Sequence, residues 1–445
     1  MIFILIWCRF RIIIMAKRMP DVDNRKLDAT MKKHCSNSES DRISELPQDV
    51  IDKVLSNLTI KEAVRTSILS KNWKEKWHTI PVITVDNPPQ TLPELESVIH
   101  YILYQHEGAI RKFSAFVDTV DQNLALQAWI YRLRKSCIQD LTLETMMQTP
   151  LSCNLYSCQQ LTHLKLRGFI LTDPPCSFKG FQNLTTLELR TIAITRPAFE
   201  GIMASSPLLE KITAKGLYFD GALKVEVPNL KYFSFEGELT SICFDTPRLA
   251  VLSINLDTQR PYCSYTRKMT GNTFSISDLP PALEELHFQW VSNESLTASS
   301  GLMQVLASCS SHLKILKLGD ACCCEKVYNL QSVSKFWEEE DETSGCSLMN
   351  QLRKMSIRAC LDRRTCFGKN NPEIKFSQFV LANSPLLEEL TIESMTCCTD
   401  IEAYVRAQLQ PFCKASGKPQ IHCIAGADFA PFASTTQFSS HTVWF

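Results

Sequence analysis

Cysteine and histidine are the residue types in this chain that could do chemistry, through zinc binding or nucleophilic catalysis. The sequence holds 19 cysteines and 9 histidines in 445 residues. Structural zinc sites need two ligand pairs at C-x2–4-C spacing, which neither Cys322–Cys324 nor Cys397–Cys398 provides, and Cys360 and Cys366 follow later in the chain. The motifs G-x-S-x-G, H-E-x-x-H, G-x-G-x-x-G and the P-loop are absent, and no Cys/His pair stands out. We therefore expect no catalytic site, no metal and no cofactor.

The charge balance and the cysteine pattern narrow the class of protein further. The chain has 47 basic and 47 acidic residues, whereas nucleic-acid surfaces usually carry an excess of Lys and Arg. We therefore expect no nucleic-acid partner. The odd number of cysteines, scattered along a long chain, differs from a short disulfide scaffold. This pattern predicts reduced thiols and a location in the nucleus or cytoplasm.

The N-terminal stretch MIFILIWCRFRIIIMAKR resembles a targeting segment only superficially. Arg9 and Arg11 interrupt its apolar residues, and a membrane span needs about 20 of them in a row. A signal peptide would carry its positive charge before the apolar run and small residues after it. We expect no membrane association and a disordered leader over residues 1–40, with Met15, Met19 and Met31 as alternative starts.

Three short helices are predicted between residues 41 and 80. The first begins near Pro47 and ends by Asn57, since proline suits a first helical turn. The second runs through IKEAVRTSI, with Thr59 as N-cap and Glu62 completing a capping box. The third includes KNWKEKW, in which two tryptophans lie four residues apart on one helical face.

This helical block has more apolar side chains than three short helices can cover. The first helix alone presents Val50, Ile51, Val54, Leu55 and Leu58 as one broad stripe. Domains below about 40 residues rarely bury enough surface to be stable alone. From pattern alone, the stripe has two possible destinations, the rest of this chain or the surface of another protein. For Trp77 we predict packing within the chain, whereas the pattern leaves Trp73 open between the two.

A repeated motif of the form L-x-x-L-x-L, with apolar substitutes, begins near residue 138 and occurs ten times. The repeats are IQDLTL (138–143), LTHLKL (161–166), LTTLEL (184–189), the unit with Leu209, Ile212 and Ala214, LKYFSF (230–235), LAVLSI (249–254), LEELHF (283–288), LKILKL (313–318), LRKMSI (352–357) and LEELTI (387–392). The first steps are 19 to 25 residues long, which is the period of leucine-rich repeats. The apolar-polar-apolar ending of each unit predicts a β-strand.

Segments between these strands predict helices or inserted loops. RPAFEGIMASSPLLE (196–210) and KFSQFVLANSPLLE (375–388) each read as a short helix followed by a connector. Stretches 257–281 and 325–350 predict inserted loops, and the acidic run from Glu338 to Glu342 predicts a solvated one. Strands alternating with helices predict an α/β fold, a solenoid whose curved parallel sheet lines one face and whose helices cover the other.

Two stretches resemble a known plant family, the F-box proteins with leucine-rich repeats and an FBD region. DRISELPQDVI, with AVRTSILSKNWKEKW after it, is similar to the F-box, and LRKMSIRAC together with IKFSQFVLANSPLLEELTI is similar to the FBD region. The resemblance covers residues 41 to 425. It implies a disordered leader over 1–40, an F-box over 41–85, leucine-rich repeats over 86–345, FBD-like C-terminal repeats over 346–425 and a tail over 426–445.

The resemblance implies a non-catalytic substrate-recognition subunit of an SCF-type E3 ubiquitin ligase. Its F-box would bind the adaptor subunit that links it to cullin, and its repeats would bind an unknown target protein. An alternative is an interaction scaffold that acts outside a ubiquitin ligase. The residues at adaptor-facing positions are Leu46, Pro47, Val50, Ile51, Val54, Leu55 and Leu58, with Ala63, Val64, Ser70 and Trp73 as further contributors.

Candidate target-binding residues follow from the strand pattern, because polar strand positions alternate with buried ones and face the open side of the sheet. The candidates are His163, Lys165, Thr186, Glu188, Gln289, Lys317 and Thr391.

Overall fold

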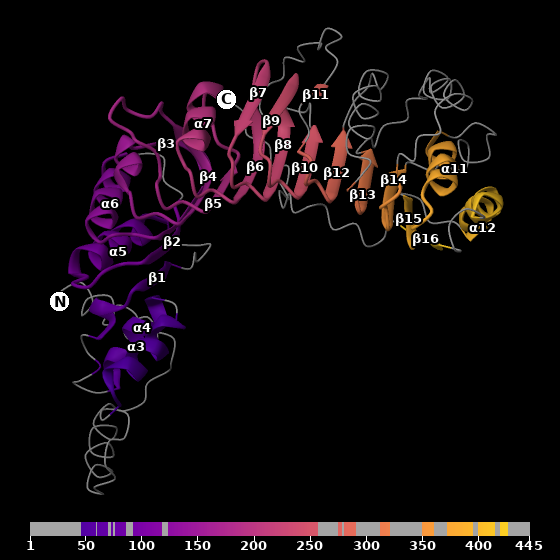
Figure 1. The fold of residues 1–445 in the computed structure, drawn as a ribbon. Coiled ribbons are helices and arrows are strands. Elements are labelled where there is room, and N and C mark those ends of the chain that lie inside the picture. Colours follow the sequence, from indigo (N-terminus) through magenta and orange to yellow (C-terminus); the bar gives the residue numbers. More distant parts are fainter. Residues whose placement is uncertain are drawn as a thin grey trace, which may run out of the picture.

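A computed structural model of the chain forms a curved arc built on one long β-sheet (Figure 1). It describes residues 46–58, 60–69, 73, 76–85, 92–117, 123–256, 275–277, 280–290, 312–320, 349–359, 372–394, 399–413 and 419–425. Among these residues, no helix is both long and apolar enough to cross a bilayer.

The long sheet has thirteen strands, and every pairing between neighbours is parallel. In spatial order the strands are β1 (Val82–Val85), β2 (Lys112–Phe116), β3 (Asp140–Leu151), β4 (His163–Leu171), β5 (Thr186–Arg190), β6 (Lys211–Tyr218), β8 (Tyr232–Glu238), β10 (Val251–Leu256), β12 (Glu285–Trp290), β13 (Ile315–Asp320), β14 (Lys354–Ala359), β15 (Glu389–Ser394) and β16 (Gln420–Ala425). Because this order follows the chain, each repeat packs beside the next one, as in a solenoid.

The core lies on one face of this sheet because apolar residues occupy alternate strand positions. In β5, Leu187 and Leu189 are buried, whereas the residues between and beside them stay partly exposed. Register pairs place Leu187 beside Leu164 and Ile212, so the buried side chains form continuous rows across strands. The ten predicted strands and the α/β solenoid are thereby confirmed.

Helices and a second small sheet form the outer, convex layer (Figure 1). The layer contains α5 (Leu92–Gln105), α6 (Asn123–Lys135), η3 (Cys153–Ser157), α7 (Arg196–Ala204), α11 (Pro372–Asn383), α12 (Thr399–Leu409) and the parallel strands β7 (Ala222–Glu226), β9 (Ser241–Asp245) and β11 (Ser275–Ser277), and η4 (Gln410–Phe412) follows α12. Helix α7 begins where the Thr195 hydroxyl accepts a hydrogen bond from the Ala198 amide, a typical N-cap.

Several elements differ from the sequence expectations. Strands β1, β2 and β16 extend the sheet beyond the repeats that the motif revealed, and β7, β9 and β11 form a sheet that no pattern predicted. The predicted loop 257–281 contains β11, although most of it lies outside the described residues. Nearly all of 325–350 also lies outside them, including the run from Glu338 to Glu342.

The N-terminal block consists of α3 (Gln48–Ser56), α4 (Ile60–Arg65), η1 (Thr66–Ile68) and η2 (Lys76–Thr79). The first two predicted helices are confirmed, with the second ending in a 3-10 turn. The third is wrong in type, since its described part is the short 3-10 helix η2. The predicted cap Thr59 lies outside the described residues.

A buried histidine connects this block to the repeats. His106 follows α5, and its Nδ1 and Nε2 lie 3.0 Å and 2.8 Å from the carbonyl oxygens of Gly108 and Ile80. Arg132 of α6 donates from Nε to the Leu103 carbonyl oxygen over 3.1 Å. Burial lowers the pKa of His106, which favours the neutral imidazole.

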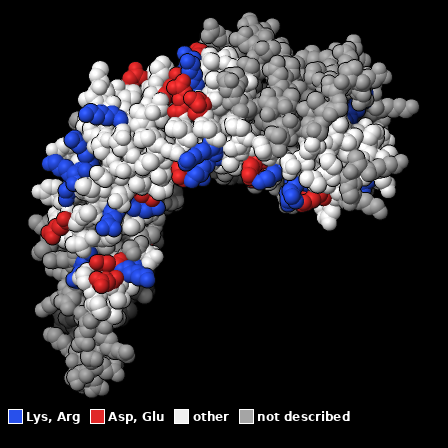
Figure 2. Space-filling model, viewed as in Figure 1, with Lys and Arg blue, Asp and Glu red and all other residues white. Residues whose placement is uncertain are grey.

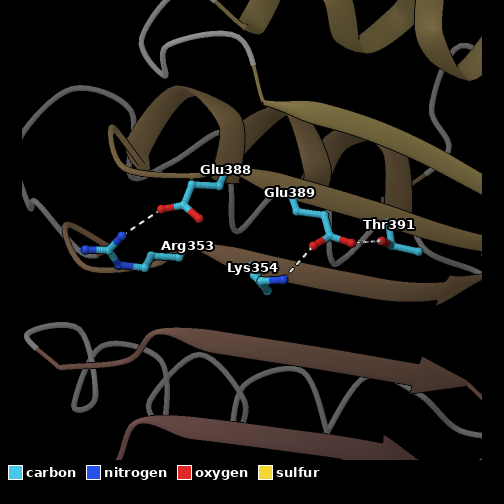
Figure 3. Close-up of polar contacts among 5 residues, drawn as sticks. All are labelled: Arg353, Lys354, Glu388, Glu389 and Thr391. Carbon is cyan, nitrogen blue, oxygen red and sulfur yellow. Dashed lines mark hydrogen bonds and ion pairs between the residues drawn. The ribbon is translucent and has the colours of Figure 1, made fainter.

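Ion pairs at the start of the strands link neighbouring repeats. Figure 3 shows Arg353 Nη1 at 2.6 Å from Glu388 Oε1 and Lys354 Nζ at 2.9 Å from Glu389 Oε2. Pairs of the same kind join β6 to β8 and β12 to β13. These side chains are exposed, so each pair contributes little to stability. The pairs instead match opposite charges across the strand register.

Candidate functional site

Helix α3 divides its apolar stripe between the interior and the solvent. Ile51 and Leu55 are 3% and 0% exposed, and both belong to the core. Val50 and Val54 are each 42% exposed. Because they lie four residues apart, the two valines share one side of the helix. We call this pair the α3 outer face.

The other candidate adaptor residues also separate by burial. Pro47, just before α3, is exposed. The partly buried Leu46, Leu58 and Val64 pack against the core, whereas Ala63 and Trp73 are buried in it, and Ser70 lies outside the described residues. Burial within the chain directs Ile51, Leu55, Ala63 and Trp73 away from a partner surface in this structure.

Two tryptophans and one leucine complete the account of the block. Trp77 is buried, which confirms its predicted packing within the chain, and its ring lies 6.4 Å from that of Tyr101 in α5. Trp73, which the pattern left open, is buried as well. Leu69 is 52% exposed, although the sequence pattern counted it among the side chains to be covered.

Polar contacts fix α3 against η2. Gln48 donates from Nε2 to Asp52 Oδ1 over 2.6 Å, one turn further along the helix. Its Oε1 accepts a hydrogen bond from Lys76 Nζ in η2. These contacts position α3 while leaving the α3 outer face open.

The concave side of the arc carries the second candidate surface. The seven candidate target-binding residues all lie on strand positions of the solvent-facing parity. Six of them are exposed or half-buried, but Thr391 is only 9% exposed and therefore offers little contact area. Their predicted orientation is confirmed, whereas their contact with a target stays a prediction.

The strand register brings some of these candidates together and separates others. His163 pairs with Thr186, and Lys165 pairs with Glu188, on strands β4 and β5. Gln289 and Lys317 lie on the neighbouring strands β12 and β13 in different rows, since the register partner of Lys317 in β12 is His287. The candidates therefore form one group on β4 and β5 and another on β12 and β13, with Thr391 further along the sheet on β15.

The second group surrounds a half-buried histidine that the sequence did not single out. Burial, with a smaller contribution from nearby Lys317, lowers the pKa of His287 to about 4. Glu285 Oε2 lies 3.7 Å from His287 Nε2, and this atom is buried without a hydrogen-bond partner. At neutral pH the imidazole is therefore uncharged.

The first group has a third row of charged side chains that sequence reasoning missed. Arg167, Arg190 and Lys215 directly follow the last apolar residue of the motif in β4, β5 and β6. Continuing the alternation by one further polar position would have identified them.

No group of three or more His, Cys, Asp or Glu side chains suited to a metal occurs among the residues that the structure describes. The cysteines weighed as zinc ligands, Cys322–Cys324, Cys360, Cys366 and Cys397–Cys398, all lie outside those residues. Burial raises the pKa of Cys158 to about 12, which keeps this thiol protonated and unreactive.

Comparison with known proteins identifies two domain types along the chain. The family model of the F-box domain matches residues 43–83, and that of the FBD-associated F-box protein At5g56370 LRR repeats matches residues 126–270. The first match contains α3, α4 and η2, and the second contains strands β3 to β10.

Relatives in Arabidopsis thaliana carry the same combination in their names. F-box/FBD/LRR-repeat protein At1g13570 is 26% identical over 414 residues, covering 86% of this chain and 98% of its own length. F-box/FBD/LRR-repeat protein At1g51370 is 30% identical over 31% of this chain and 32% of its own length. FBD-associated F-box protein At4g10400 is 28% identical over 55% of this chain and 60% of its own length. These matches confirm the resemblance inferred from the sequence.

Proposed function

Because this chain joins an F-box domain to leucine-rich repeats of the FBD-associated type, we propose that it is the substrate-recognition subunit of an SCF-type E3 ubiquitin ligase. Its F-box would bind the adaptor subunit and, through it, cullin. Its concave repeat surface would bind the target protein. The role is non-catalytic, since the conjugating enzyme supplies the activated ubiquitin.

The observation that carries this proposal is the exposure of the α3 outer face in a small helical block. Val50 and Val54 lie next to the exposed Pro47, while Ile51 and Leu55 anchor the helix in the core. An amphipathic helix whose second apolar side stays exposed suits docking into the groove of another protein. Each valine that becomes fully buried would contribute about 1–2 kcal/mol before association costs.

The arrangement of the two surfaces supports rate enhancement by proximity. The F-box block lies at one end of the arc, and the repeats extend from it as one continuous sheet (Figure 1). A target bound to the repeats is thereby held near an enzyme recruited through the F-box. Such tethering raises the effective concentration of the two reactants.

Co-purification with the adaptor tests the proposal. The full-length chain is expressed with the adaptor and cullin, either unaltered or as the double variant Val50→Glu and Val54→Glu. A matched control carries Leu208→Glu and Leu386→Glu, because these leucines are 48% and 44% exposed in the repeats. We expect the α3 variant to lose the adaptor and the control to retain it.

The readout also separates a ligase from a scaffold that acts outside one. Cullin in the purified complex and ubiquitylation of bound proteins support the ligase role. Adaptor binding without cullin or ubiquitylated species would contradict that role and support the scaffold. Equal adaptor binding by the α3 variant and the control would contradict the interface.

A further inference from the structure

Three basic side chains lie in one row across the concave face. In the strand register, Arg167 of β4 pairs with Arg190 of β5, and Arg190 pairs with Lys215 of β6. Glu144 of β3 and Glu236 of β8 occupy the same row on either side. We call Arg167, Arg190 and Lys215 the basic row. Figure 2 shows basic side chains along the inner edge of the arc.

Placing like charges on adjacent strands is unfavourable unless something else stabilises them. Side chains directly opposite each other in a sheet are in contact, and like charges in such pairs are destabilising. Parallel neighbours lie about 4.8 Å apart, so the basic row concentrates three cations within about 10 Å. Such a row attracts anions.

The nearby carboxylates are engaged mainly by lysines. Glu144 Oε1 lies 2.6 Å from Lys165 Nζ, and its other oxygen lies 3.8 Å from Arg167 Nη1. Glu236 Oε2 lies 3.4 Å from Lys215 Nζ. Thus the acidic residues at both ends of the row make their shorter contacts with lysines rather than with arginines.

The two guanidinium groups retain unused hydrogen-bonding capacity. Arg190 Nη2 lies 3.8 Å from Glu188 Oε2, which is beyond hydrogen-bond distance, as is the contact of Arg167 with Glu144. Arg190 Nε is buried and has no hydrogen-bond partner. An unpaired buried donor costs free energy that a bound acceptor would recover. Both side chains remain partly exposed, at 33% and 40%.

The same strands carry one more cation without a carboxylate contact among the described residues. Lys211 lies at the first position of β6, with its Nζ 5.1 Å from the centre of the Tyr232 ring. Counting Lys165, the three strands β4 to β6 present five cations, and Glu144, Glu188 and Glu236 are the carboxylates that face them. The patch is therefore net positive, although the whole chain is neutral.

We infer that the basic row binds an acidic segment of the target protein, with Arg167 and Arg190 as the principal carboxylate contacts. This inference rests on the proposed function, in which the concave surface holds the target. Guanidinium groups bind carboxylates through paired hydrogen bonds, and arginine is better suited to this than lysine. Two or three carboxylates spaced by about one strand separation would match the row.

The test measures binding of defined peptides to the full-length chain in complex with its adaptor. The probe is a fluorescent ten-residue peptide of alternating Glu and Ser, followed by fluorescence anisotropy. One comparison peptide replaces Glu with Gln, and another replaces Ser with phosphoserine while carrying Gln in place of Glu. We expect the Glu peptide to bind and the Gln peptide to bind at least tenfold more weakly.

Matched variants assign the binding to the basic row. Arg167→Gln with Arg190→Gln should weaken the Glu peptide by about tenfold or more, equivalent to about 1.4 kcal/mol. Lys179→Gln with Lys224→Gln removes the same charge from exposed positions outside the long sheet and should leave binding unchanged. Arg167→Lys with Arg190→Lys should fall between the two, since charge is kept but the paired hydrogen bonds are lost.

Three outcomes would overturn the inference. They are equal affinity of the two Gln double variants, equal affinity for the Glu and Gln peptides, and binding of the phosphoserine peptide alone. Adaptor co-purification and the melting temperature are measured on the same preparations. Loss of peptide binding with the adaptor retained supports the basic row, whereas loss of the adaptor contact by the unaltered chain would contradict the proposed ligase role instead.

Discussion

The imidazole Nε2 of His106 lies 2.8 Å from the carbonyl oxygen of Ile80, 26 residues earlier in the chain. Ile80 directly follows η2 of the N-terminal block, and His106 directly follows α5 of the repeat region. Both residues are buried. This contact fixes the orientation of the block at the point where the long sheet begins.

Replacing His106 tests the importance of this junction. His106→Ala removes the polar contacts to two buried carbonyl groups and leaves a cavity. We expect it to lower the free energy of unfolding by about 1–3 kcal/mol. The exposed His100 of α5 provides the control, because His100→Ala removes an imidazole without a buried contact. A melting temperature equal to that of the control would contradict the assigned role.

Acidification should destabilise the protein through its buried histidines. Burial lowers the pKa of both His106 and His287, the latter to about 4. Between about pH 6.5 and pH 4 the unfolded chain therefore binds more protons than the folded one, so stability rises with pH. The stabilisation is fully present above about pH 6.5 and is lost as the pH falls through the folded pKa values.

A variant of His287 isolates its share of that pH dependence. His287→Gln should flatten the stability profile between pH 6.5 and 4, with at most about 3 kcal/mol as its contribution. Glu285, 3.7 Å away, favours the charged imidazole and reduces this amount. The exposed His312 serves as control in His312→Gln. Denaturant titrations at several pH values give the profiles, and identical slopes for the two variants would exclude the effect.

Two glycines should respond in opposite directions to alanine. Gly180 has a φ of +88°, and a Cβ there would lie 1.7 Å from the Ser205 carbonyl oxygen. Gly180→Ala should therefore lower the free energy of unfolding by at least about 2 kcal/mol. Gly201 lies within α7 with open space around it, so Gly201→Ala should raise stability by up to about 1 kcal/mol. Thermal unfolding of both variants checks the contrast, and equal effects would contradict it.

The two sides of α3 should separate stability from binding. Ile51→Ala and Leu55→Ala create cavities and should each lower stability by about 2–4 kcal/mol. Val50→Ala and Val54→Ala remove exposed methyl groups and should change stability by less than about 0.5 kcal/mol while weakening the adaptor complex. Melting temperatures and adaptor affinity are measured for all four variants. Stability losses from the valine variants as large as those from the core variants would contradict the division.

Much of the architecture followed from local pattern. Apolar side chains at alternate positions, repeated with a period near 20 residues, predicted ten strands that all lie in the sheet. Strand β16 escaped this reasoning because QIHCIA (420–425) lacks the leucine framework, and β1 was hidden among flanking prolines. These strands are specified by pairing with a neighbour, which a local pattern does not record.

The sequence by itself determined that the chain folds as a helical block followed by a solenoid, because helical and strand periodicities are local properties. It also marked the α3 stripe as too apolar for so small a block. Only the tertiary structure decided which side of that stripe is covered, burying Ile51 and exposing Val50. Likewise, Arg167 and Arg190 are 23 residues apart in the chain, and only strand register makes them neighbours. Burial and charge proximity depend on contacts between distant segments, so they emerge only when the repeats stack.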